Sequence, residues 1–222
     1  MSVNRIAVLT LVCLLTTAWT LAAENTQESR TGSLLAAIEK SCRARGISPG
    51  HGHKVLPVAQ AILKIKDRIS EIKGADPMLS QVAALLHDIG GGGLPGETKG
   101  PPIAKEILTE QKCDPAMIER VCRIIATHHH LKGNLDISIG ERPEWLLVII
   151  ADRPDVIRQY EAAPQDAESL ERDVNAWIVK LNRDIRWKVE PTASPQQLLL
   201  WPGQAPVGDG KSEAANTTIT VH

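Results

Sequence analysis

Hydrophobic residues recur three or four positions apart through most of the chain, and this spacing predicts amphipathic helices. One stripe follows Ser48-Pro49, a helix-start signal with a capping hydroxyl and a proline at the first helical position. Its members are Val55, Val58, Ala59, Ile62, Ile65 and Ile69. Further helices are expected over 33–45, 76–89 and 101–112, from Pro115, from Pro143 through Asp152 towards Val156, and over 166–187. No segment has convincing strand periodicity, so we expect an all-α bundle of about six to seven helices.

The two ends of the chain differ in composition from this helical region. Arg5, an uncharged apolar run from Ile6 to Leu21, and small residues at Ala22 and Ala23 are typical of an export signal. We therefore expect a signal peptide over 1–23, a flexible lead-in over 24–32, a domain over 33–189, and a flexible C-terminal tail over 190–222. The domain would be periplasmic or secreted. An uncleaved membrane anchor is the alternative, although the run is shorter than the ~20 residues that usually span a bilayer.

Composition adds limits to this picture. Hydrophobic residues make up 43% and charged residues 23%, as in globular proteins, while aromatics make up only 3% and Phe is absent. A core of Leu, Ile, Val and Ala suits helix-on-helix packing. The formal net charge of −1 argues against a dedicated binder of nucleic-acid duplexes. The cysteines beyond the signal lack metal-ligand spacing, and we expect no disulfide, with a Cys42–Cys113 bond as the alternative in an oxidising compartment.

Ionisable residues interrupt the apolar stripes at several places. Asp152 stands where the stripe of Trp145 and Val148 requires a hydrophobic residue. His87-Asp88 ends a helix that is otherwise uncharged, and His128-His129 extends an apolar face. A buried carboxylate without a partner costs several kcal/mol, so these groups are expected to meet in one shared site.

A mixed set of imidazole nitrogens and carboxylate oxygens predicts a divalent metal ion. Mn, Ni, Co, Fe, Mg and Zn all accept such ligands, whereas thiolate-preferring metals do not favour them. Water bound to such an ion becomes acidic enough to act as a nucleophile near neutral pH.

Four blocks occur in a characteristic order: His51-x-x-Lys54-Val55-x-x-x-Ala59, Leu-Leu-His87-Asp88-Ile-Gly, Ile125-x-x-His128-His129 and Ile150-Ala151-Asp152. Over about residues 48–160 the chain resembles the HD-domain superfamily of metal-dependent phosphohydrolases. The resemblance implies an HD-type helical bundle. It also implies hydrolysis of a phosphomonoester or phosphodiester in a small substrate, in many members a nucleotide.

The resemblance implies roles for individual residues. The ligands of one metal ion per chain would be His51, His87, Asp88 and Asp152. Asp88, Lys54 and His128 are candidate catalytic residues, and His129, Lys132 and Arg153 are candidate contacts of the substrate phosphate. Members with two metals often carry a further His after the HD pair, and Gly100 stands at that place here. This difference argues against a second metal.

Several alternatives stay open. His53 competes with His51 as the first ligand, and Asp152 would instead form a buried ion pair with Lys54 or Arg153. His128 and His129 would contact phosphate, bind a weak second metal, or simply end a helix, where protonated His is favoured by the macrodipole. At the level of function, the alternatives are a catalytically silent metal- or ligand-binding module and a diiron oxygenase of the same fold.

Overall fold

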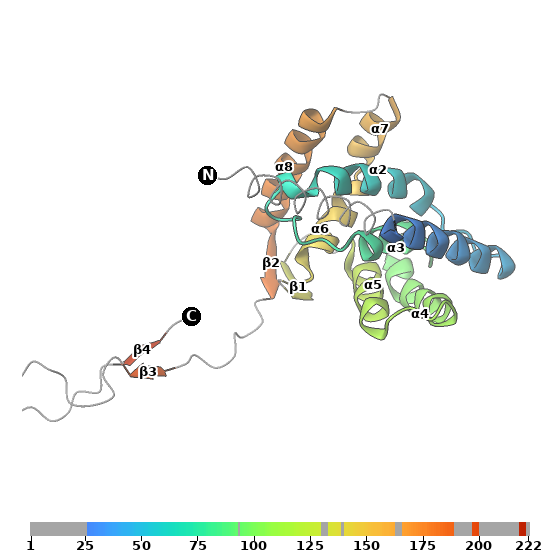
Figure 1. The fold of residues 1–222 in the computed structure, drawn as a ribbon, viewed down its shortest axis with the longest axis horizontal. Helices are drawn as coiled ribbons and strands as arrows, with labels where there is room; N and C mark the ends of the chain where they lie inside the picture. The colour runs from blue at the N-terminus through green and yellow to red at the C-terminus, as the bar shows by residue number, and fades with distance from the viewer. Residues whose placement is uncertain are drawn as a thin grey trace, which may run out of the picture.

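The computed structural model describes residues 26–92, 94–129, 133–138, 140–162, 166–188, 197–199 and 218–220. The predicted signal over 1–23 and the candidate Lys132 lie outside these ranges. The described chain is dominated by helices that pack around one core (Figure 1). This architecture confirms the all-α fold class.

The first helix covers residues 26–44. It begins earlier than expected, within the segment 24–32 for which a flexible lead-in was predicted. Thr31 lies on a buried position of this helix, and its hydroxyl donates to the carbonyl of Gln27 at 3.0 Å. The helix ends where Gly46 adopts a positive φ of 66° and Ile47 N donates to Cys42 O at 2.9 Å.

Helix α2 (Gly52–Ile65) carries the first long stripe and continues into the short 3-10 helix η1 (Lys66–Arg68). Helix α3 (Pro77–Leu86) starts as its sequence predicts. Asp76 accepts a hydrogen bond from Leu79 N at 2.9 Å, and Pro77 occupies the first turn. Almost every residue of α3 is buried, and this places it at the centre of the bundle.

Helix α4 (Leu94–Glu110) is longer than the predicted helix over 101–112, and Pro101 and Pro102 lie inside it. The glycines of this region explain the difference. A Cβ atom at Gly100 would lie 2.6 Å from Cγ2 of Ile125, so α4 approaches helix α5 (Pro115–Thr127) closely. This packing outweighs the weak local preference of the sequence.

The predicted helix from Pro143 through Asp152 towards Val156 is two helices. Helix α6 (Arg142–Ala151) ends with Asp152 as its C-cap, and helix α7 (Pro154–Ala162) begins at Pro154. Proline cannot continue a helix because it lacks the backbone donor, but it suits a first turn. The break leaves Asp152 at a helix end rather than within a helix.

Helix α8 (Ala167–Asp184) runs directly into strand β2 (Ile185–Lys188), which pairs in parallel with β1 (Gly133–Ser138). Strands β3 (Gln197–Leu199) and β4 (Thr218–Thr220) form an antiparallel pair. The expectation of no strands was therefore wrong for these short segments. Both β3 and β4 lie in the part of the chain predicted to be a flexible tail.

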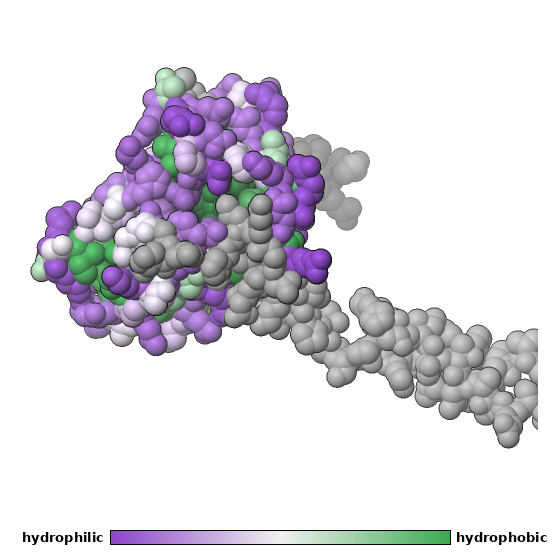
Figure 2. Space-filling model, turned by 180° about the vertical axis from the view of Figure 1, so that it is seen from behind, coloured by the Kyte–Doolittle hydropathy of each residue, from purple (hydrophilic) through white to green (hydrophobic). Residues whose placement is uncertain are grey.

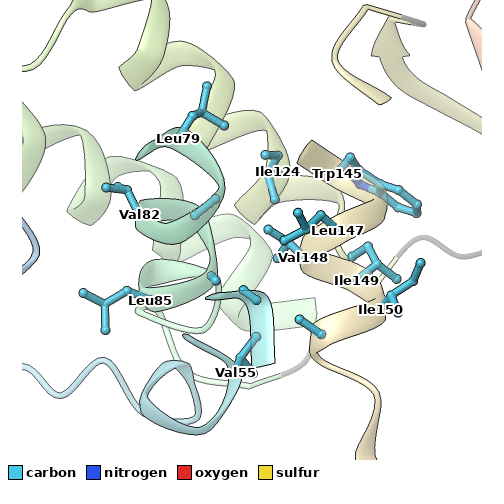
Figure 3. Packing of buried hydrophobic residues seen from close by; sticks show 14 of the residues in the cluster. Val55, Leu79, Val82, Leu85, Ile124, Trp145, Leu147, Val148, Ile149 and Ile150 are labelled. Atoms are coloured by element: carbon cyan, nitrogen blue, oxygen red, sulfur yellow. The ribbon is translucent and has the colours of Figure 1, made fainter. Parts of the chain in front are cut away.

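The core is built mainly around α3 and α6. Residues Trp145–Ala151 of α6 are all buried, and they pack beside α3, with Ile124 of α5 close by (Figure 3). The buried indole of Trp145 donates to Thr127 Oγ1 at 3.1 Å, so its polar atom has a partner. The coloured part of the face in Figure 2 is mostly hydrophilic, with small hydrophobic areas. Among the described helices, none has the length and apolarity needed to cross a membrane.

Candidate metal centre

His87 caps the carboxyl end of α3, and its side chain is fully buried. Its Nδ1 atom lies 2.8 Å from the carbonyl oxygen of Ala84. A carbonyl only accepts hydrogen bonds, so Nδ1 must carry the proton. In the neutral ring, Nε2 therefore presents a lone pair to the interior, as metal-binding histidines do.

His128 repeats this arrangement at the carboxyl end of α5. It is the C-cap residue of that helix, it is buried, and its Nδ1 atom donates to Ile125 O at 2.7 Å. The two imidazoles meet edge to face, with ring centroids 5.2 Å from His128 to His87. Two helices that end side by side thus direct two Nε2 atoms of the same tautomer into one region.

Asp88 connects the two imidazoles. Its Oδ2 atom lies 3.7 Å from Nε2 of His87, and its Oδ1 atom lies 3.4 Å from Nε2 of His128. Oδ1 of Asp88 and both Nε2 atoms are buried and have no hydrogen-bond partner in the described part of the chain. The ligand atoms of these three residues lie within 4.8 Å of one another. Buried polar atoms are rarely left without partners, so this group is suited to a cation.

His51 and Asp152 complete the site on its more exposed side. Oδ1 of Asp152 lies 3.2 Å from Nε2 of His51 and 3.2 Å from Nε2 of His87. The side chains of His51 and Asp152 are 37% and 25% exposed, whereas that of His87 is 0% exposed. The structure therefore brings together the four residues predicted to bind one metal ion, and it leaves one side of the group open to solvent.

The position of His51 depends on Gly52. A Cβ atom at Gly52 would overlap the backbone carbonyl of Leu85, so the start of α2 lies directly against the end of α3. Only glycine allows this approach. The close contact between the two helix ends carries His51 to within 6.0 Å of His87, measured between ring centroids.

The charges of this group shift its protonation equilibria. Burial alone would lower the pKa of His87, but the carboxylate of Asp152, the carbonyl of Ala84 and the carboxylate of Asp88 together raise it. His128, whose Nε2 atom lies 3.4 Å from Oδ1 of Asp88, lowers the pKa of Asp88 against the effect of burial. Asp88 is thus an anion at neutral pH, as a metal ligand must be.

A second group adjoins the first and contains a residue that the sequence reasoning missed. The buried carboxylate of Glu97, on α4, accepts a hydrogen bond from His129 N at 3.0 Å and lies 3.5 Å from His129 Nδ1. The ligand atoms of Glu97, His128 and His129 also lie within 4.8 Å of one another. Burial, followed by the charge of His128, lowers the pKa of His129. The sequence offered one sign that Glu97 lies near the site, which is its position one turn before Gly100. This sign could be used only once the structure showed that α4 begins at Leu94.

The other candidate residues lie elsewhere or have other partners. The side chain of Lys54 is 61% exposed, and its ammonium nitrogen lies 3.9 Å from Oε1 of Glu161. The guanidinium of Arg153 lies 4.3 Å from the ring centre of Trp177. His53 is half exposed and lies 3.7 Å from Glu39, away from the ion pair that His51 makes. The ion pair between Asp152 and Lys54 or Arg153, considered as an alternative, is not among those formed by the described residues.

The three cysteines among the described residues lie outside the metal-binding groups. Cys42, Cys113 and Cys122 are free thiols, and Cys42 is buried. Burial raises the pKa of each thiol, so the reactive thiolate is disfavoured. Cys42 and Cys113 are not bonded to each other in the structure.

Comparison with known families agrees with this geometry. The family model described as HD domain matches residues 53–185, more than half of the 222-residue chain. The match includes the histidine and aspartate groups at the ends of α3, α5 and α6, and it begins just after His51. Neither the curated proteins nor the solved structures gave a match. The chain belongs to the HD-domain family, which is typically a family of metal-dependent hydrolases.

Proposed function

We propose that this protein is a metal-dependent phosphohydrolase that cleaves a phosphomonoester or phosphodiester in a small molecule such as a nucleotide. One observation carries the proposal. Three buried polar atoms, Nε2 of His87, Nε2 of His128 and Oδ1 of Asp88, face one another without hydrogen-bond partners in the described chain. Leaving such atoms unpaired costs about 1–3 kcal/mol each, and a cation bound by His87 and Asp88 would remove part of this cost.

The residues that would hold the ion are His51, His87, Asp88 and Asp152. Their mixture of imidazole and carboxylate suits Mn, Fe, Co, Ni or Zn, and Mg less well. When bound, the ion would supply Lewis acidity and an acidified water molecule. The protein contributes a fixed tautomer at His87, since the bond from Nδ1 to Ala84 O keeps the ligand nitrogen directed inward.

The exposure of the ligands supports access for a phosphorylated substrate from one side. His87 is sealed in the core, Asp88 is 16% exposed, and His51 and His129 are 37% and 36% exposed. A substrate phosphate would therefore approach along the side of His51 and His129, and the buried side would exclude bulk water. Water exclusion strengthens electrostatic interactions in the site.

A second candidate function is a metal-binding module without turnover. It is favoured by the placement of the basic residues, because Lys54 lies beside Glu161 and Arg153 stacks on Trp177. Two of the cations proposed to neutralise a substrate phosphate thus have other partners. Lys132 remains a candidate phosphate contact.

The deciding experiment is a hydrolysis screen of purified protein loaded with Mn or Ni. The substrates are an aryl phosphomonoester, an aryl phosphodiester and a broad nucleotide panel. We expect metal-dependent release of product, and its loss in Asp152→Asn with helicity retained. Complete inactivity in protein that demonstrably holds the metal would support the silent module instead.

A further inference from the structure

A groove lies at the end of the α2–α3 pair that is opposite to the metal centre. It runs between the first helix, the last turns of α2 and the beginning of α3, and it encloses about 560 Å³. His51 and Lys64 mark the two ends of α2, about 20 Å apart at a rise of about 1.5 Å per residue. Sites for small ligands usually have volumes of about 300–1,000 Å³, so the groove is large enough for one.

Part of the lining of the groove is apolar. Leu35 of the first helix, Leu63 of α2 and Pro77 of α3 contribute this part. The wall has no side chain at Gly32, and nothing lies within 4 Å of the position that a Cβ atom would take there. A larger residue at this position would extend into the groove, so glycine keeps it open.

Two side-chain amides fix a hydrogen-bond acceptor in the lining. Nε2 of Gln81 donates to Pro77 O at 3.1 Å, and because a carbonyl only accepts, the orientation of this amide is determined. Its Oε1 atom accepts from Nε2 of Gln60 at 2.9 Å. Oε1 of Gln60 remains as an acceptor for an N–H group of a ligand, since no hydrogen bond among the described residues uses it.

Two opposite charges complete the lining. Glu28 lies on the first helix, and Lys64 lies in the last turn of α2. Neither side chain forms an ion pair with another described residue. The charges of the groove therefore cancel, and a phosphorylated anion would meet the carboxylate of Glu28. A ligand with an ammonium group at one end and a carboxylate at the other is complementary to both charges.

We propose that this groove binds a short peptide of two or three residues with free termini. Its ammonium group would lie at Glu28 and its carboxylate at Lys64. A peptide N–H would donate to Oε1 of Gln60, and an apolar side chain would pack on Leu35 and Leu63. The site is separate from the metal centre, so this proposal goes beyond the proposed function and does not depend on it.

The test is calorimetric titration of the full-length protein with leucyl-leucine, its N-acetyl form and its C-terminal amide. Each modification removes one charged end, so we expect each modified peptide to bind at least about tenfold more weakly than leucyl-leucine. Free leucine lacks the peptide group and should also bind more weakly.

Two variants assign the ends of the peptide to the two charges. Glu28→Gln should weaken the binding of leucyl-leucine about tenfold and leave that of the N-acetyl form unchanged, because that form has no ammonium group to lose. Lys64→Gln should behave in the same way towards leucyl-leucine and the C-terminal amide. The matched controls are Asp67→Asn, 75% exposed, and Lys40→Gln, since neither residue lines the groove. Both controls should bind like the wild type.

Gly32→Leu blocks the groove without removing a contact. The free space at this position accepts the side chain, and leucine is the better helix former, so the free energy of unfolding should be maintained or increased. Binding of leucyl-leucine should be lost. Unchanged affinity in this variant would overturn the proposal, as would equal affinities for the free and the modified peptides, equal affinity for free leucine, or no binding to the wild type.

Titration of metal-loaded and metal-stripped protein separates this proposal from the proposed function. The affinity for leucyl-leucine should be the same in both. Peptide binding in protein that hydrolyses no phosphoester would support the groove and contradict the phosphohydrolase. Hydrolysis without peptide binding would leave the phosphohydrolase standing and remove the groove as a site.

Discussion

Nε2 of His51 and Oδ1 of Asp152 lie 3.2 Å apart, although the two residues belong to helices far apart in the sequence. His51 precedes the first turn of α2, and Asp152 follows the last turn of α6. Both are therefore at helix ends, where the chain can turn a side chain toward the site without breaking a helical stripe. His51 and His53 thus have different surroundings, because His51 lies beside Asp152 and His53 lies beside Glu39.

These surroundings predict different effects for two neighbouring histidines. His51→Gln should weaken metal binding at least about tenfold. Even the loss of a residue that only supports a ligand typically lowers metal affinity by that factor. His53→Gln should leave the affinity unchanged, because His53 lies beside Glu39 and is 51% exposed. Metal titration by calorimetry measures both. Equal weakening in the two variants would remove His51 from the ligand set.

Asp88→Ala should reduce the metal content to less than about a tenth of the wild-type value, since it removes the carboxylate between His87 and His128. Helicity should be preserved because α3 ends at Leu86, before the substituted position. Elemental analysis and far-UV circular dichroism give the two quantities. The control is Asp67→Ala, since the side chain of Asp67 is 75% exposed. Unchanged metal stoichiometry in Asp88→Ala would contradict the assignment of the centre.

Gly52→Ala should damage the fold and the centre together. The added methyl group would overlap the carbonyl of Leu85, so α2 must move away from α3. We expect a loss of about 1–3 kcal/mol in the free energy of unfolding, as for other overpacking substitutions, and weaker metal binding through displaced His51. Urea denaturation and metal titration measure these effects.

Gly32→Ala is the matched control for this substitution. Nothing lies within 4 Å of a Cβ atom at Gly32, which is within the first helix. Alanine there should stabilise the protein by about 0.5–1 kcal/mol, because glycine is a poor helix former. A neutral result at Gly52 would show that the contact between α2 and α3 does not position His51.

The sequence was sufficient to predict the elements that carry strong local signals. Asp76-Pro77 and the buried run after it define α3, and the polar residues at the ends of α3 and α6 marked the site. The sequence was insufficient where tertiary packing determines the extent of a helix. The start of α4 depends on contacts of Gly100 with Ile125, which no local preference encodes.

The same limit applies to Glu97. A glutamate near a proline-rich segment is typical of an exposed loop, and only the close approach of α4 to α5 buries it beside His129. In the folded protein Gly100 lets α4 lie close to α5, and Glu97 of the same helix is buried beside His129.

As pH rises and His87 loses its proton, the stability of the metal-free protein should decrease, whereas its affinity for the metal should increase. Burial disfavours the imidazolium, but Asp152 and its neighbours raise the pKa of His87 above its ordinary value of 6.5. Its protonation therefore stabilises the metal-free fold fully below pH 6.5, and this contribution is lost as pH rises through the folded-state pKa. The lowered pKa of His129 changes the pH dependence of stability in the opposite direction. The stability is therefore best measured in His129→Gln, which removes this contribution.

Metal binding requires neutral His87, so the ion must displace the proton that Asp152 retains there. We expect metal affinity to increase with pH through the raised pKa of His87, with proton release measurable by calorimetry in buffers of different ionisation enthalpy. In metal-free Asp152→Asn, the loss of the carboxylate should lower the pKa of His87, which an NMR titration of the ring measures directly. A pKa of His87 unchanged by this substitution would mean that the 3.2 Å contact does not hold the proton. The pH dependence of metal binding would then need another source.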